Sequence, residues 1–182
     1  MKFKIKSEIT TDNSIKICLT NLGKYNEGEL VYEWVKLPVQ SFEPFFKKIG
    51  LNEQYEECFI SDYEAPFKIN EYDNLNELNE IAKKCQDFSE IDWLAFSEYI
   101  DNGYNKQEAF QKVEDRDYFF IEGITDQEVG INFLEETGGL ESLPREELER
   151  YFDYDSFGRD LIINGSYHKV KSGDIYGYIS IE

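Results

Sequence analysis

The sequence predicts a mixed α+β chain made of three small units, at residues 1–72, 73–115 and 116–182. In the first unit, apolar and polar residues alternate as they do in half-buried strands. Near Tyr72 the apolar residues change to helical spacing. The last unit ends in two apolar runs around a turn at 172–174, which predicts a hairpin. We therefore expect a sheet with a helix, then a helical unit, and then an α+β unit.

The first unit should hold a small sheet packed on a short helix at Pro44–Lys48. Its first candidate strand carries lysines on one face, which would discourage edge-to-edge pairing with another chain. Trp34 is expected to be packed, and Gly23–Gly28 to form a turn or short loop because Asn and Gly accept unusual φ angles. The strands are expected at Phe3–Ile9, Ser14–Leu22, Glu29–Leu37 and Glu56–Asp62.

The central unit is expected to contain three helices. Apolar residues at helical spacing over 75–85 predict the first helix. Ser89 and Asp92 have the spacing of a capping box, in which each residue satisfies a backbone N–H of the other, and they predict the start of a second helix. Gly103 should end that helix, and Asn105 should cap the third.

The last unit begins with an aromatic run at Asp117–Glu122, which predicts a buried strand. Thr125 and Glu128 form a second candidate capping box and predict a helix behind them. Gly138 suits the end of this helix, and Pro144 suits the first turn of the next one, where its missing N–H is not needed. The terminal hairpin strands are expected at Tyr167–Val170 and Ile175–Ile181.

Negative charge is concentrated in one part of the chain. The net charge is −19, but residues 1–50 hold eight Lys and six acidic residues, and residues 161–182 are balanced. Residues 51–160 hold thirty acidic and nine basic residues, a balance of −21. Such a span repels nucleic acid and anionic membranes and attracts basic partners. A role in solubility is the simpler interpretation, but the uneven distribution favours a binding surface.

The familiar catalytic and metal motifs are missing or broken. The stretch from Asp153 resembles the start of a calcium loop, but Phe157 and Asn164 stand where the loop needs an oxygen ligand and a bidentate glutamate. His168 is the only histidine, which excludes a histidine triad and a His-based zinc site. We therefore expect no catalytic residue, no metal and no cofactor. A carboxylate pair acting as in glycosidases stays open as an alternative.

The cysteines and the hydropathy indicate a cytoplasmic protein. The three cysteines are far apart and form no CxxC, which is typical of free thiols in a reducing compartment. The N-terminus lacks the apolar core of a signal peptide, and no apolar run approaches the length that spans a bilayer. We expect neither membrane association nor direct binding of nucleic acid.

Several motifs, in the right order, resemble the ArdA family of antirestriction proteins. The most specific is LPREELERYFDYDSFGRD, with its short acidic helix, aromatic run and Phe-Gly-Arg-Asp ending. The resemblance covers residues 15–82 and 130–165. The motifs that carry it are Asn21–Leu30 (NLGKYNEGEL), Ile49–Glu57 (IGLNEQYEE), Ser61–Phe67 (SDYEAPF) and Leu143–Asp160.

The resemblance implies an elongated, curved homodimer with three small domains per chain, of the kind carried by conjugative transposons and plasmids. Such a dimer mimics B-DNA and blocks the DNA cleft in the methyltransferase core of type I restriction-modification enzymes in the bacterial cytoplasm. The family places the dimer contact in the C-terminal domain. In this sequence the corresponding antirestriction and dimer residues are Leu140, Leu143, Leu148, Tyr151, Phe152, Asp153, Tyr154, Phe157 and Gly158.

Carboxylates displayed on strands and helices would stand in for DNA phosphates. B-DNA carries about one negative charge per 1.7 Å of axis, and helix residues three or four apart lie about 5–6 Å from each other on one face. An acidic adaptor that binds a basic protein unrelated to DNA enzymes is the competing hypothesis. The candidate carboxylates are Glu53, Glu56, Glu57, Asp62, Glu64, Glu77, Glu80, Glu90, Asp92, Glu98 and Asp101.

Overall fold

The computed structural model describes residues 13–138, 144–165 and 167–181. It confirms a mixed α+β fold with two small antiparallel sheets and several helices. The elements are β1 (Ile15–Asn21), α1 (Leu22–Asn26), β2 (Tyr32–Leu37), α2 (Glu43–Lys48), β3 (Cys58–Glu64), α3 (Leu75–Lys84), the 3₁₀ helix η1 (Cys85–Asp87), α4 (Glu90–Asp101), α5 (Lys106–Glu114), β4 (Tyr118–Glu122), α6 (Asp126–Thr137), α7 (Arg145–Tyr151), α8 (Tyr154–Asn164), β5 (Tyr167–Ser172) and β6 (Ile175–Ile181).

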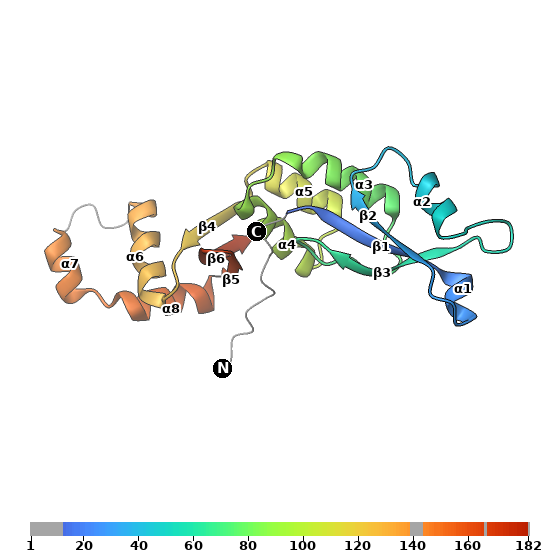
Figure 1. Ribbon diagram of the computed structural model, residues 1–182. Helices are drawn as coiled ribbons and strands as arrows, with labels where there is room; N and C mark the ends of the chain where they lie inside the picture. Colours follow the sequence, from blue (N-terminus) through green and yellow to red (C-terminus); the bar gives the residue numbers. More distant parts are fainter. Residues whose placement is uncertain (1–12, 139–143, 166, 182) are drawn as a thin grey trace.

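The molecule is elongated (Figure 1). The sheet β2-β1-β3 lies at one end with α1 and α2, and helices α6, α7 and α8 lie at the other. Helices α3, α4 and α5 and the sheet β4-β6-β5 fill the middle. The division of the chain into three domains stays a prediction.

Strand β1 is the centre of the first sheet and pairs antiparallel with β2 and β3. Its side chains Ile17 and Leu19 are fully buried, and Val35 of β2 lies beside them on the same face. Trp34, on the opposite face of β2, is 40% exposed, so the prediction that it is packed is wrong. The predicted turn at Gly23–Gly28 is also corrected, since most of it belongs to α1.

One hydrophobic cluster joins this sheet to the helices. It runs from Ile15 through the sheet and helices α3, α4 and α5 to Val113, and it also includes Val170 and Ile179 of the second sheet. Apolar burial is the main favourable term in folding, so these elements stabilise one another as a single core.

Capping boxes fix where three helices begin. Ser89 begins α4, Asn105 begins α5 and Thr125 begins α6, and in each case the third helical residue bonds back to the cap. Each cap satisfies backbone N–H groups that have no partner inside the helix. The predicted helix starts at Ser89, Asn105 and Thr125 are confirmed.

The second sheet has the order β4-β6-β5. Its hairpin strands β5 and β6 are confirmed. Strand β4 lies at the edge, and only Ile121 among its residues is buried, so the prediction of a buried strand there is corrected. The predicted strand at Phe3–Ile9 lies outside the described residues.

Helices α6 and α8 cross at two glycines, Gly130 and Gly158. A Cβ atom at Gly130 would lie 2.6 Å from the carbonyl oxygen of Tyr154, and one at Gly158 would overlap the carbonyl oxygen of Asp126. The two backbones can approach this closely only because glycine has no side chain. The crossing therefore depends on both glycines.

We expect Gly158→Ala to destabilise the protein by about 1–3 kcal/mol or more, because the added methyl group forces the two helices apart. Urea unfolding would measure the change. Asp160→Ala is the matched control, since Asp160 is exposed on the same helix. Equal stability of Gly158→Ala and the wild type would contradict the crossing described here.

Candidate acidic interaction surface

The clearest group of exposed carboxylates lies on β3 and on the loop before it. Glu53, Glu56, Glu57, Asp62 and Glu64 are all exposed. The segment 51–67 contains these five acidic residues and no Lys or Arg. The Glu64 carboxylate alone among the five has an ion pair with a described residue, at 2.7 Å from the Lys16 ammonium. This edge of the sheet therefore presents little-compensated negative charge.

Two further candidates, Glu77 and Glu80, lie on α3. Glu80 is exposed and accepts a hydrogen bond of 2.8 Å from Lys83, which lowers the pKa of its carboxyl. Glu77 is half-buried, with its carboxylate 3.9 Å from the ammonium of Lys106. Both are available at the surface, but neighbouring cations partly compensate their charge.

The candidates on α4 divide into two kinds. Asp101 is exposed at the end of the helix, and Glu90 is half-buried in its first turn, where the helix dipole favours negative charge. Asp92 and Glu98 are buried, with exposed fractions of 5% and 2%. Their assignment to an exposed mimic surface is therefore corrected. Helix α4 is buried around most of its circumference, so no outward face could be identified from spacing alone.

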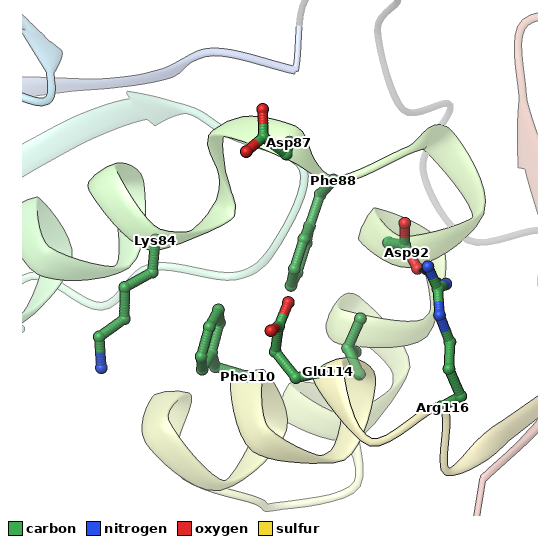
Figure 2. Close-up of a pocket in the computed structure, with 8 residues that line it drawn as sticks. Lys84, Asp87, Phe88, Asp92, Phe110, Glu114 and Arg116 are labelled. Atoms are coloured by element: carbon green, nitrogen blue, oxygen red, sulfur yellow. Dashed lines mark hydrogen bonds and ion pairs between the residues drawn. The ribbon is translucent and has the colours of Figure 1, made fainter.

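Asp92 is held by neighbours on both oxygens. Its Oδ2 accepts bonds from the backbone N–H and the hydroxyl of Ser89, at 2.9 and 2.7 Å. Its Oδ1 accepts a 2.6 Å bond from the hydroxyl of Tyr118 and another from the guanidinium of Arg116. Figure 2 shows the Asp92 and Arg116 side chains pointing toward each other. The capping box was the signal that could have revealed this occupied carboxylate.

Burial and hydrogen bonding act in opposite directions on this cluster. Burial alone would raise the pKa of Asp92, but the bonds from Ser89 and Tyr118 and the charge of Arg116 outweigh it and lower the pKa. Burial and the bond to Asp92 raise the pKa of Tyr118 to about 12. Asp92 is thus an anion that joins the start of α4 to β4, and its role is structural.

Two more polar contacts join α4 to the C-terminal sheet. The carboxylate of Glu98 lies 3.4 Å from Nδ1 of His168 on β5. The Tyr99 hydroxyl donates to the backbone carbonyl of Asp117, just before β4. The first contact links residues 70 positions apart and the second links residues 18 positions apart, so local sequence patterns could not identify either of them.

The residues of the C-terminal motif differ in exposure, and some of its aromatic side chains pack on one another. Tyr151 is 80% exposed and Leu148 is half-buried. Phe152 packs its ring against the rings of Tyr154 and Phe157, with centroids 4.8 and 5.3 Å apart. Leu140 and Leu143 lie outside the described residues.

Gly158 is buried in the crossing of α6 and α8, where it serves the packing of one chain. The dimer contact expected from this motif stays a prediction. Asp153 caps α8 and accepts bonds from the backbone N–H and hydroxyl of Ser156, at 3.0 and 2.7 Å. Its carboxylate therefore fixes a helix start. No group of three or more His, Cys, Asp or Glu among the described residues could hold a metal ion.

A groove of about 360 Å³ lies between the start of α4 and the end of α5 (Figure 2). The rings of Phe88 and Phe110 are stacked in it at 5.9 Å, and the ammonium of Lys84 lies 5.1 Å from the Phe110 ring. Burial, together with the charge of Glu114, raises the pKa of nearby Cys85 to about 12, so its thiol is not a nucleophile at neutral pH. The groove offers no arrangement for nucleophilic catalysis. Its lining residues are Lys84, Asp87, Phe88, Asp92, Phe110, Val113, Glu114 and Arg116.

We expect Asp92→Asn to lower the free energy of unfolding by about 2 kcal/mol, the usual range for hydrogen bonds to a charged group. The pKa of Asp92 is lowered by folding, so its contribution is present above the ordinary value of about 3.9. It is lost as the pH falls through the lower pKa of the folded state. Urea unfolding between pH 7 and pH 2.5 measures this, with exposed Asp87→Asn as the control. Equal stability of the two variants at pH 7 would contradict the structural role.

Comparison with known proteins identifies the chain. A family model described as "Antirestriction protein (ArdA)" matches residues 17–176, including the region 85–130 where no motif had indicated a resemblance. A search of curated proteins found no match. None of the helices among the described residues has the length and apolar character needed to cross a membrane. The match extends over most of the two sheets and the helices between them, and the chain belongs to the ArdA family of antirestriction proteins.

Proposed function

We propose that this protein inhibits type I restriction-modification enzymes by occupying their DNA-binding cleft as a mimic of B-DNA. The observation that carries the proposal is the exposed sheet edge at 53–64. It presents five carboxylates, and the segment that holds them contains no Lys or Arg. A cleft that binds DNA carries Lys and Arg for the phosphates. An acidic protein surface attracts such a cleft and repels DNA itself.

The acidic surface continues beyond that edge. After the correction of Asp92 and Glu98, nine candidate carboxylates remain on the surface or half-buried. They lie on β3 and the loop before it, on α3 and at both ends of α4. Figure 1 shows these elements in the part of the elongated molecule that holds the first sheet and the central helices. These positions supply negative charge at several places along an extended surface, as a duplex does. The nine are Glu53, Glu56, Glu57, Asp62, Glu64, Glu77, Glu80, Glu90 and Asp101.

The protein acts in this proposal by binding, with no catalytic step. It would meet its target in the cytoplasm, where restriction enzymes protect the cell. An enzyme would depend on one or two side chains, whereas a mimic distributes its affinity over many. Exposed ion pairs are typically worth about 0–1 kcal/mol each, so no single carboxylate should dominate.

A homodimer would double the length of the acidic surface. We place the contact in the C-terminal unit, as the family resemblance implies. Among the described residues of this unit, four large apolar side chains are exposed: Phe119, Ile124, Tyr151 and Ile163, with exposed fractions of 37%, 56%, 80% and 65%. Burying such side chains between two chains is favourable.

We predict a graded loss of binding as carboxylates are removed. A single Glu→Gln or Asp→Asn change among the nine should weaken binding to the methyltransferase core by at most about fivefold, since each pair is worth at most about 1 kcal/mol. Binding should weaken step by step as four substitutions are combined: Glu53→Gln, Glu56→Gln, Glu57→Gln and Asp62→Asn. Added salt should also weaken it, and duplex DNA should displace the protein.

The control removes four charges elsewhere, from Glu122, Asp155, Asp160 and Asp174, which are exposed in the C-terminal unit. An equal loss in both groups would indicate attraction by net charge alone. One carboxylate that carries nearly all the affinity, or binding that salt does not affect, would refute the mimic. Binding that duplex DNA cannot displace would favour the acidic adaptor.

We predict that light scattering at micromolar concentration gives about twice the chain mass of 21.5 kDa. Tyr151→Ser combined with Ile163→Ser should shift the protein toward the monomer, because both exposed side chains would lose apolar burial. Tyr72→Ser is the matched control, since Tyr72 is 74% exposed in the first unit. A wild-type monomer would contradict the dimer and leave the charge mimicry standing.

A further inference from the structure

One face of the first sheet packs on the core. On the other, which we call the open face, Cys18 and Thr20 of the central strand are buried, and the exposed side chains belong to the flanking strands β2 and β3. On β2 the side chains of Val35 and Leu37 point into the core, with exposed fractions of 0% and 4%. Tyr32, Trp34 and Lys36 alternate with them and point the other way. Tyr32 is 51% exposed and Trp34 is 40% exposed. An edge strand thus presents two large aromatic side chains on its open face.

The pairing register places an acidic strand opposite these aromatic residues. Cys18 of β1 pairs with Trp34 on one side and with Asp62 on the other, so all three lie in one row on the open face. The next row runs from Lys36 through Lys16 to Glu64, and the Lys16 ammonium pairs with the Glu64 carboxylate at 2.7 Å, so Asp62 is the carboxylate of these two rows without an ion pair to a described residue. Neighbouring strands are about 4.8 Å apart, so Trp34 and Asp62 are separated by about 10 Å across a small central residue.

A third aromatic side chain extends the open face at the end near α1. Thr20 of β1 pairs with Tyr32 on one side and with Phe59 on the other. The ring of Tyr25, on α1, packs edge-on against Phe59 with centroids 5.3 Å apart, and Tyr25 remains 54% exposed. The exposed aromatic side chains of this face are therefore Tyr32 and Trp34 on β2 and Tyr25 beside Phe59 of β3, and we call these three the aromatic strip.

The chemistry of the strip selects the kind of partner. Trp and Tyr faces attract guanidinium groups, and Arg stacks on them better than Lys does. The Asp62 carboxylate, in the same row as Trp34, can neutralise such a cation, whereas the Glu64 carboxylate is already paired with Lys16. The same carboxylates disfavour DNA and anionic lipid as occupants. Exposed Trp and Tyr, together with Arg, are also the side chains that most often dominate protein interfaces.

We propose that the aromatic strip receives arginine side chains from the DNA-binding cleft of the restriction enzyme. This rests on the proposed function and deepens it. An arginine that would bind a phosphate in DNA stacks on Trp34 or Tyr32 and pairs with a carboxylate of β3. Salt screens the exposed charge contact, but it weakens the close stacking contact much less and does not screen the apolar burial. The strip therefore supplies a part of the affinity that persists at high salt.

The test is the affinity for the methyltransferase core, measured over a salt series. The variant is Tyr32→Thr combined with Trp34→Thr, because threonine suits an exposed strand and leaves all the charges in place. We expect binding to weaken by about tenfold or more at every salt concentration, the effect of losing interface anchors. The slope of log Kd against log salt should stay that of the wild type.

Two controls separate the strip from charge and from folding. Tyr72→Thr removes an aromatic side chain that is 74% exposed outside the strip, and it should change Kd by less than about twofold. The four-carboxylate variant described above should reduce the salt slope, because it removes charge contacts. Urea unfolding of the double threonine variant should match the wild type, since both replaced side chains are exposed.

Three outcomes overturn the proposal. If the double threonine variant binds within about twofold of the wild type while the carboxylate variant is weakened, the strip is not a contact and the mimic still stands. If the wild type does not bind the core at all, the proposed function fails as well. If light scattering shows that the double threonine variant is a monomer where the wild type is a dimer, the strip is a contact between copies of this chain.

Discussion

The buried carboxylate of Asp92 is the constraint on which the arrangement of the molecule depends. It begins α4 through Ser89, and it binds Arg116 and Tyr118 at the start of the C-terminal sheet. A buried anion is tolerated only where hydrogen bonds and an opposite charge compensate its desolvation, and Asp92 has both. The central helices and the C-terminal sheet are thereby held in one relative position. Such a rigid connection suits the mimicry of an extended duplex that we propose.

A second rigid connection is the crossing of α6 and α8, where two residues without side chains allow the helices to pack closely. Gly130 and Gly158 allow α6 and α8 to approach until backbone atoms touch. The family motif therefore includes a residue whose role is packing within one chain, next to residues that are free for contact with another. Tyr151 illustrates the second kind, since it is mostly exposed at the end of α7. Proximity in sequence did not separate these two roles, because α7 and α8 present different faces to the solvent.

Charge alone makes a protein attractive to every basic surface. The exposed carboxylates at 53–64 give long-range attraction, but screening limits each of them at physiological salt. In the binding mode proposed above, Tyr32 and Trp34 of the aromatic strip add contacts that act at short range and depend on geometry. The combination resembles what DNA offers a protein, because DNA presents phosphates for charge and flat rings for stacking. We infer that a mimic gains selectivity by reproducing both features.

The sequence by itself determined the family and most of the secondary structure. Alternation, helical spacing and capping residues such as Ser89, Asn105 and Thr125 act within a few positions of the chain, so their effects can be read locally. It could not determine which carboxylates reach the solvent, because burial depends on elements that meet only in the folded chain. Glu98 is buried because β5 brings His168 to it from 70 positions away. Tertiary packing also decided which face of the first sheet is exposed. The core covered one side of β2, and Trp34 was left on the other.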